Sequence, residues 1–359
     1  SYSQEHKVVL QAGSVNRDRS KDESTQGIAV FRAADGSLVW DDDLVYAGPC
    51  LLVGDRILTQ NAAIHLLTGK PIKRADPLTG AAADWKFSRN YGCNSAIGCT
   101  NLLAFRSAAA GYFDLAGDGG TGNLGGFRSS CTSNLVPADG VLSAPDYTRT
   151  CVCSYQNQCS LAFVHMPEIE TWTFNTHSRG SEPLKRLGIN FGAPGDRRVA
   201  GGSLWIEFPS VGGTSPKVPV EIIGKKVEYF RQHASRIETG PLPWVAASGI
   251  RGAEHIKITL EDPKDPSPAR KYRVRLTFTD LAPEKPKYPE NAGPVRMDIS
   301  LQGTQVLSRF DVRAAAGGVN RGVVREFPDI EAAATLEIEL SPSDDGDSTT
   351  LSGVEIVEE

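Results

Sequence analysis

Short apolar segments alternate with turn-forming residues along the first half of the chain. The segments are strand-length, rich in β-branched residues and bounded by Gly, Asp, Asn or Pro; they cover residues 8–10, 28–31, 38–40, 51–53, 56–59 and 64–67. Between them, residues 34–37 (Ala-Asp-Gly-Ser) and 68–70 (Thr-Gly-Lys) supply the turn chemistry that tight hairpins need. The pattern predicts an antiparallel meander.

The second half of the chain shows an apolar-polar alternation typical of strands. It is clearest in residues 272–280 (YRVRLTFTD) and 336–340 (LEIEL), where one face of each strand would be buried and the other wet. About eight strands are expected, enough for a sandwich. They cover residues 204–208, 218–223, 255–260, 272–279, 295–301, 319–327, 335–340 and 354–357.

A polar segment that contains Gly and Pro separates the two halves. Residues 175–186 (NTHSRGSEPLKR) have the composition of an interdomain linker. The sequence therefore predicts an all-β protein with a first domain over residues 1–175, a linker over 176–187 and a second domain over 188–359.

Composition and charge exclude several classes of protein. The chain has 36 Gly and 22 Pro among 359 residues, which argues against a helical bundle. Its net charge is −5 and Lys and Arg form no run of five, so nucleic acid is not an expected partner. No apolar stretch approaches the ~18 residues that a membrane span needs.

Cysteine placement suggests an exported protein of the periplasm, the cell surface or the extracellular space. All seven cysteines precede residue 160 and none belongs to a C-x-x-C pair, which argues against a zinc ribbon or a haem attachment site. Disulfides are the preferred interpretation, with Cys50 left over, and reduced buried thiols are the alternative. The candidates are Cys93, Cys99, Cys131, Cys151, Cys153 and Cys159.

Two segments of the first half form a repeat. FRAADGSLVW (residues 31–40) and IHLLTGKPIK (residues 64–73) each have a strand, a turn ending in Gly and a second strand. They resemble the repeat of PQQ-like β-propellers, in which Trp40 would dock between neighbouring blades, while Lys73 departs from the pattern. Residues 89–167 resemble the terminal portion of PQQ-like propellers in planctomycete-type exported proteins.

This resemblance implies an incomplete propeller. At about 40 to 45 residues per blade, residues 1–175 would make three or four blades, too few to close a ring. The remaining blades would be absent or supplied by another chain, which predicts an oligomer or a complex. Residues 107–160 are expected to form an irregular, Cys-rich insertion. Its DLAGDGGTGN segment loosely resembles a calcium loop through Asp114, Asp118 and Asn123, with a solvated Gly-rich loop as the alternative.

The second half resembles the malectin family, a jelly-roll sandwich related to galactose-binding domains. The resemblance rests on INFGAPGD (189–196), LWIEFPSVGG (204–213), YRVRLTFTDL (272–281), VRMDISLQGTQVLSRFDV (295–312), AAGGVNRGVVREFPDI (315–330) and LSGVEI (351–356). Disaccharide-binding members have a Tyr-Phe pair where this chain has Ala282-Pro283.

Aromatic faces and carboxylates in loops at one end of a sandwich are the groups that recognise carbohydrate. The candidates expected in loops or at loop edges are Tyr229, Phe230, Trp244, Tyr288, Asp345 and Asp347. Packing of each aromatic side chain in the core is the alternative.

No motif for catalysis is present: the chain lacks G-x-S-x-G, H-E-x-x-H, a P-loop and a helix-opening G-x-G-x-x-G. The preferred hypothesis is an exported binding or scaffold protein for glycans or other protein chains, without catalysis or a redox cofactor. The alternative is an incomplete subunit of a PQQ-dependent alcohol or sugar dehydrogenase, which would hold PQQ and calcium.

Overall fold

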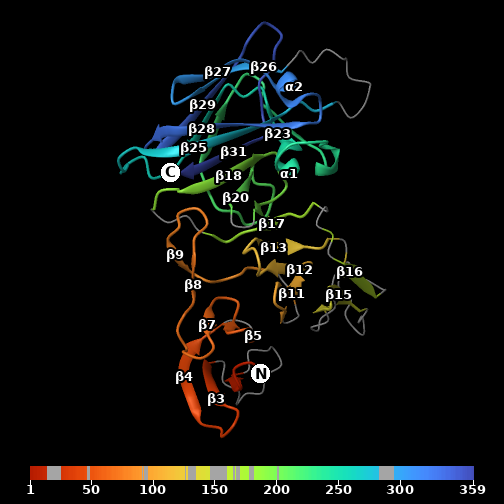
Figure 1. The fold of residues 1–359 in the computed structure, drawn as a ribbon, viewed down its shortest axis with the longest axis vertical. Coiled ribbons are helices and arrows are strands. Elements are labelled where there is room, and N and C mark those ends of the chain that lie inside the picture. Colours follow the sequence, from red (N-terminus) through yellow and green to blue (C-terminus); the bar gives the residue numbers. More distant parts are fainter. Residues whose placement is uncertain are drawn as a thin grey trace. The chain divides into compact units, whose positions relative to one another are not determined.

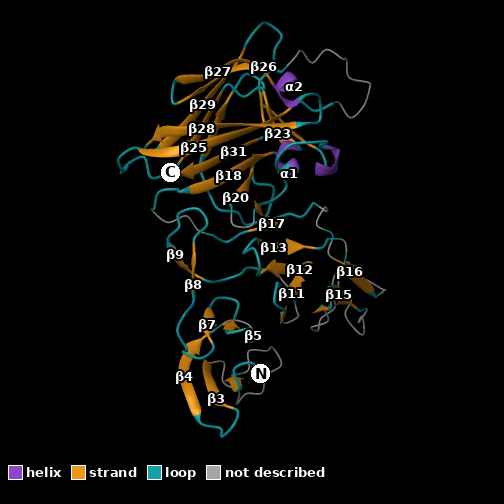
Figure 2. Cartoon of the chain, viewed as in Figure 1, coloured by secondary structure: helices purple, strands orange, loops and turns teal. Residues whose placement is uncertain are grey.

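The protein is all-β, as the sequence predicts (Figure 2). The computed structural model describes residues 1–13, 26–46, 49–90, 92, 96–125, 127, 135–145, 160–164, 166, 170–177, 182–199, 202–282 and 295–359. Within these ranges no helix has the length and apolarity of a membrane span. The chain divides into two compact units. Unit 1 comprises Ser1–Asp76 and Ala82–Thr176, and unit 2 comprises Pro77–Ala81 and His177–Glu359.

Unit 1 begins with small antiparallel sheets that follow one another along the chain (Figure 1). The first pairs β1 (Tyr2–Ser3), β2 (Val8–Ala12), β3 (Gln26–Arg32) and β4 (Leu38–Val45) in that order. The second contains β5 (Leu51–Val53), β6 (Arg56–Leu58) and β7 (Ala63–His65), and the third is the hairpin of β8 (Lys73–Ala75) and β9 (Ala82–Asp84). The predicted antiparallel meander is confirmed for these strands.

Two further sheets belong to unit 1. One has the order β10 (Ile97–Gly98), β11 (Leu102–Ser107), β12 (Ala109–Asp114), β13 (Gly120–Asn123) and β17 (Thr173–Phe174). The other has the order β14 (Val136–Ala138), β15 (Val141–Ala144) and β16 (Leu161–Val164).

The expected irregular insertion over residues 107–160 contains regular structure. Strands β12 to β15 all lie inside it. On β12, Ala110 and Phe113 are buried in two different apolar clusters, and this burial stabilises the strand. The structure does not confirm the sheets of unit 1 as propeller blades. The partial propeller therefore stays a prediction.

Trp40 contacts the turn that follows the neighbouring sheet of β5, β6 and β7. Its Nε1 donates a hydrogen bond to the carbonyl oxygen of Leu66, 2.7 Å away, in the turn that follows β7. The ring lies so close to Gly69 that a Cβ there would be 2.9 Å from it. Because Gly69 also has a φ of +67°, both the conformation and the space favour glycine at this turn.

Unit 2 is a sandwich of two sheets. The six-stranded sheet has the order β19 (Arg197–Arg198), β20 (Leu204–Phe208), β18 (Arg186–Phe191), β31 (Gly353–Glu358), β25 (Arg270–Thr279) and β28 (Gly322–Ala332). The five-stranded sheet has the order β21 (Val220–Ile223), β24 (His255–Thr259), β29 (Thr335–Pro342), β26 (Arg296–Leu301) and β27 (Thr304–Asp311). Every strand predicted for this half is present, most of them within two or three residues of the predicted ends.

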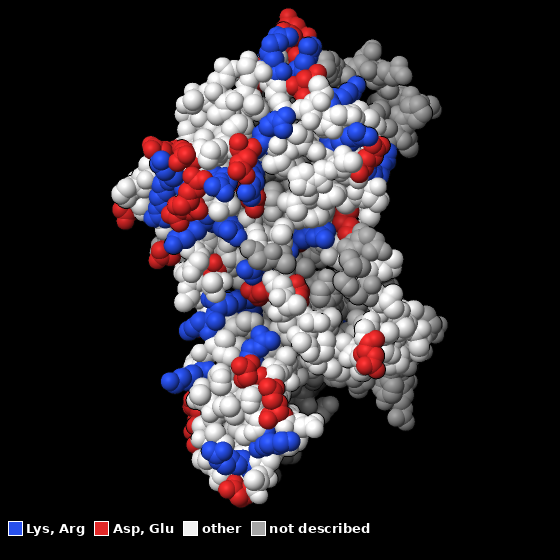
Figure 3. Space-filling view, in the orientation of Figure 1, with Lys and Arg blue, Asp and Glu red and all other residues white. Residues whose placement is uncertain are grey.

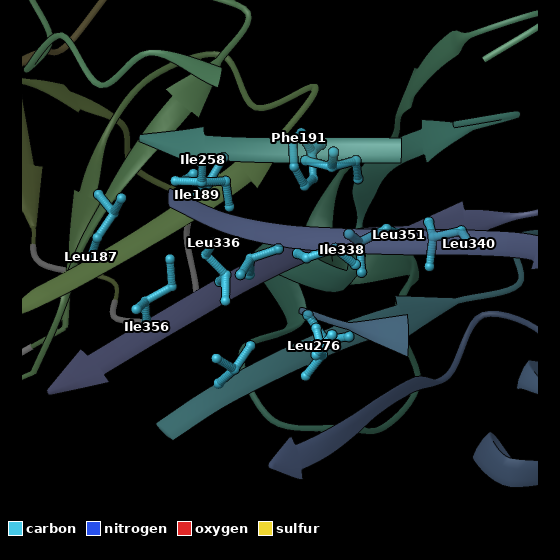
Figure 4. Packing of buried hydrophobic residues seen from close by; sticks show 14 of the residues in the cluster. Leu187, Ile189, Phe191, Ile258, Leu276, Leu336, Ile338, Leu340, Leu351 and Ile356 are labelled. Carbon is cyan, nitrogen blue, oxygen red and sulfur yellow. The ribbon is translucent and has the colours of Figure 1, made fainter. Parts of the chain in front are cut away.

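The main apolar core lies between these two sheets (Figure 4). Leu276 and Ile356 come from the six-stranded sheet, and Ile258, Leu336 and Ile338 come from the five-stranded sheet. All five side chains are almost completely buried. This burial, at about 25 cal/mol per Å² of apolar surface, is the main force that holds the sandwich together.

The start of unit 2 corrects the predicted linker. Residues 176–187 were expected to be a polar connection, yet Leu184 and Leu187 are buried in the sandwich core. Arg186 opens β18 and pairs with Val357 of β31. Leu184 precedes β18 and Leu187 lies within it, and the polar residues around them conceal that both are buried.

A smaller sheet and two short helices complete unit 2. The sheet has the order β22 (Glu228–Arg231), β23 (Ser248–Arg251) and β30 (Thr350–Leu351). Between β22 and β23 lie the 3-10 turn η1 (Ala234–Arg236) and helix α1 (Pro243–Ala246). Helix α2 (Val312–Ala316) follows β27, and its N-cap Asp311 accepts a hydrogen bond from the amide of Ala314 at 2.8 Å.

Candidate functional site

The most exposed of the candidate aromatic side chains that the structure describes lies on the small sheet of unit 2. Tyr229 is on β22, opposite Ile250 of β23, and 42% of its surface is exposed. Partial burial raises the pKa of its hydroxyl above the ordinary value, so the group stays protonated at neutral pH. It can therefore both donate and accept a hydrogen bond.

Phe230, the next residue, is held in place by its neighbours. It lies opposite Gly249, where a Cβ would come within 2.4 Å of the Phe230 ring. The guanidinium carbon of Arg251 lies 5.0 Å from the ring centroid, a cation-π arrangement. Tyr229 and Phe230 were expected in loops or at loop edges, whereas both form ladder pairs of the four-residue strand β22.

Charged side chains border this sheet. Glu228 pairs across the ladder with Arg251, and its carboxylate lies 2.8 Å from Nζ of Lys226. The hydrogen bond between Lys226 and Glu228 lowers the pKa of Glu228 and raises the pKa of Lys226. Sequence reasoning did not single out these three residues. Lys226 and Glu228 lie close in sequence to two adjacent aromatic residues, Tyr229 and Phe230, and this was the signal that could have indicated them.

Trp244 is buried rather than presented to solvent. It lies on α1 with 7% of its surface exposed, and its ring meets that of Trp205 edge to face at 5.7 Å between centroids. The guanidinium carbon of Arg197 lies 5.0 Å from the Trp244 centroid. Its carbonyl oxygen accepts a hydrogen bond from Asn190 Nδ2. Of the two expectations for Trp244, a ligand-facing loop position or packing of the ring, the structure shows packing, because the ring lies against Trp205.

The two acidic candidates differ from each other. Asp345 is exposed in the turn after β29. The Asp347 side chain is only 2% exposed and lies 3.3 Å from Arg296 Nη2. It also accepts a hydrogen bond from the amide of Asp344, so it stabilises the turn. Tyr288 lies outside the described residues.

The fold brings part of the predicted set to one place. The acidic turn leads into β30, where Thr350 pairs with Arg251 of β23. Tyr229 and Phe230 lie on β22, the other neighbour of β23. One three-stranded sheet thus joins an exposed tyrosine, an arginine and the end of the acidic loop, and we call β22, β23 and β30 the small sheet.

The six-stranded sheet carries a second charged surface on β25 and its neighbours (Figure 3). Arg275 contacts Glu326 at 2.5 Å and Glu355 at 2.9 Å. Lys271 contacts Asp329 at 2.9 Å. Because positive and negative groups are paired, this surface presents no strong field of one sign.

The weak calcium candidates lie on a hairpin. Asp114 ends β12, and its Oδ1 accepts hydrogen bonds from the amides of Ala116 and Gly117. Asp118 is ion-paired with Arg74 at 2.7 Å. Asn123 pairs with Gly111 at the far end of β13, away from the turn. The structure brings the two aspartates to one turn but not the asparagine. Calcium binding stays a prediction.

The cysteines that the structure describes do not form disulfides. Cys99 carries a free thiol in the connection between β10 and β11, which corrects the expected disulfide at that position. This connection is closed by the backbone instead, since the amide of Cys99 donates to the carbonyl of Leu102 at 2.9 Å. Cys50 also carries a free thiol, as expected. The other candidates, Cys93, Cys131, Cys151, Cys153 and Cys159, lie outside the described residues.

Groups suited to metal chemistry do not gather in the part of the chain that the structure describes. No three or more His, Cys, Asp or Glu side chains converge there as a metal ion would require. The small sheet offers an exposed aromatic ring with a protonated hydroxyl, that of Tyr229, on one face, and the charged side chains of Glu228 and Arg251 on the other.

Comparison with known proteins gives no family. No protein-family model matches the chain, and no curated protein matches it. Among solved structures, a β-glucuronidase of Bacteroides uniformis is similar at 15% identity over 48% of this chain and 18% of its own, with a TM-score of 0.35. The plant receptor-like kinase FER is similar at 14% identity over 49% of this chain and 42% of its own, with a TM-score of 0.31.

The extracellular domain of ANXUR2 from Arabidopsis thaliana is similar at 12% identity over 49% of this chain and 41% of its own, with a TM-score of 0.34. In each case the match spans less than half of the other chain. TM-scores this low carry no argument about function.

Proposed function

We propose that the chain is an exported binding protein that recognises glycans through the small sheet of unit 2. The observation that carries the proposal is the exposure of Tyr229, which has 42% of its surface exposed and is held in a strand by its ladder pair with Ile250. An aromatic face can stack against sugar C–H groups, and its hydroxyl can bond a sugar hydroxyl. The resemblance of residues 188–359 to the malectin family supports the same chemistry.

The Tyr229 hydroxyl would supply the polar contact on its face of β22, because successive side chains of a strand point to opposite faces. Glu228, Phe230 and Arg251 lie on the other face, where Arg251 is placed over the Phe230 ring. The ion pair of Glu228 with Lys226 is exposed to solvent. Groups that are already positioned lose little conformational freedom on binding, which favours affinity. Recognition of another protein chain is the second use of such a surface. The partial propeller would then serve as a scaffold, in an oligomer or in a complex that supplies further blades.

The proposal predicts that the purified chain binds a class of oligosaccharides on a printed array. For the strongest oligosaccharide, Tyr229→Ala is expected to weaken affinity about tenfold or more, because an aromatic stacking face and a hydrogen bond are lost. Isothermal titration measures this change. Tyr2→Ala is the matched control: Tyr2 is also exposed, at 53%, but lies on β1 of unit 1. It should leave affinity unchanged.

Two results would contradict the proposal. One is an array without binding, and the other is binding that Tyr229→Ala and Tyr2→Ala weaken equally. A tightly bound quinone, seen by absorbance and mass spectrometry together with oxidation of alcohols or sugars, would favour the PQQ-dependent dehydrogenase subunit instead.

A further inference from the structure

A hairpin turn whose fourth residue has a positive φ occurs four times between strands of unit 1. It comprises residues 33–36 after β3, 66–69 after β7, 77–80 after β8 and Asp76, and 115–118 after β12, so its fourth residue is Gly36, Gly69, Gly80 or Asp118. All four have positive φ angles, of 73°, 67°, 72° and 48°. In the second and third turns, the residue after the glycine donates its amide to the threonine hydroxyl, Lys70 to Thr68 and Ala81 to Thr79.

The second position of this turn is exposed in three copies and buried in one. Ala34 and Ala116 are exposed, and Leu67 has 37% of its surface exposed. Leu78 is 0% exposed and belongs to the sandwich core of unit 2. The turns after β7 and β8 share the sequence Leu-Thr-Gly. The different burial of Leu67 and Leu78 therefore comes from the surrounding structure and not from the sequence of the turn.

The backbone of Leu78 also makes hydrogen bonds within unit 2. Its carbonyl oxygen accepts hydrogen bonds from the amides of Lys185, at 2.7 Å, and Arg186, at 3.0 Å. These amides lie where β18 begins, next to Leu184 and Leu187 of the core. The carbonyl oxygen of Leu78 thus accepts hydrogen bonds from two amides where β18 begins. The Leu78 side chain is buried in the same core cluster as Leu184 and Leu187.

We propose that Pro77–Ala81 is a docked peptide of unit 2: the sandwich has a binding position for an apolar turn, and this chain fills it with its own third hairpin turn. Unit 2 is therefore formed by two separate segments of the chain. Residues 177–359 alone lack the core side chain of Leu78 and its carbonyl oxygen, which accepts hydrogen bonds from Lys185 and Arg186. The segment Pro77–Ala81 belongs to the compact unit that contains the sandwich. This inference does not depend on the proposed glycan binding.

Hydrogen exchange of the full chain, followed by mass spectrometry, tests the proposal. In Leu78→Ala the amides of Lys185 and Arg186 should exchange roughly 30-fold faster or more, which corresponds to about 2 kcal/mol for a buried leucine. Exchange in β2 and β3 of unit 1 should not change. Leu67→Ala is the matched control. It removes the same atoms at the equivalent position of the turn after β7, where the side chain is 37% exposed, and should leave hydrogen exchange in β18 unchanged.

Leu78→Met keeps most of the volume and should retain near-native protection, so it remains informative if Leu78→Ala does not fold. The proposal is overturned if Lys185 and Arg186 are unprotected in the unsubstituted chain. It is equally overturned if Leu78→Ala changes β18 no more than Leu67→Ala does.

Discussion

Trp40 shows how a single residue links two sheets of unit 1. Trp40→Ala removes the ring from Gly69 and the hydrogen bond to Leu66, so we expect a loss of about 2 kcal/mol or more in the free energy of unfolding. Trp40→Phe keeps the packing and should lose only about 1 kcal/mol. Urea denaturation measures both changes, and equal losses would show that the hydrogen bond, not the packing, dominates.

Cys50 and Tyr46 predict a response to alkaline pH. Burial raises the pKa of the Cys50 thiol to about 11 from its ordinary 9.0, and that of Tyr46 to about 12. Between pH 9 and 11 the unfolded chain releases the thiol proton before the folded chain does. The free energy of unfolding should therefore fall as pH rises through this window.

Urea denaturation at pH 8 and pH 10 checks this prediction, with Cys50→Ala as the comparison. The variant should show a smaller decline between the two values, because only the contribution of Tyr46 remains. An identical decline in both proteins would contradict the assignment to Cys50.

At the scale of the elements, two glycines let Trp205 lie flat on the six-stranded sheet. A Cβ at Gly188 would be 2.3 Å from the Trp205 ring, and one at Gly353 would be 2.9 Å from it. Gly188→Ala should lower the free energy of unfolding by about 1 to 3 kcal/mol, because the ring must move. Thermal or urea unfolding measures the loss.

A double-mutant cycle gives the control for this prediction. In a Trp205→Leu background the added methyl group has space, so Gly188→Ala should cost clearly less than it does alone. Additive losses would mean that the two residues do not share the predicted contact.

The elements show what the sequence could and could not predict. Alternation in residues 272–279 predicted a strand that β25 confirms, since its apolar positions face the core. Tyr229 and Phe230 were expected in loops or at loop edges and lie on β22, because residues 228–231 are too short for a strand to be recognised from their pattern. Trp244 illustrates a different limit: composition cannot tell a ring packed beside Trp205 from one that faces solvent.

At the scale of the whole molecule, the division after Thr176 lies at the start of the linker that the sequence predicts. The return of Pro77–Ala81 to unit 2 had no signal in the sequence. Leu78-Thr79-Gly80 repeats Leu67-Thr68-Gly69, and only long-range packing distinguishes the two turns. Local pattern thus predicted the strands, whereas contacts between distant segments decided which unit a turn joins.

Binding at the small sheet is the central claim, and a hydrogen-exchange footprint tests it most directly. The full chain would be compared with and without a saturating amount of the oligosaccharide that binds most strongly on the array. The account predicts slower exchange in β22 and β23, around Tyr229 and Arg251, with little change in β25 and β28. Protection confined to β25 and β28, or to unit 1, would contradict it.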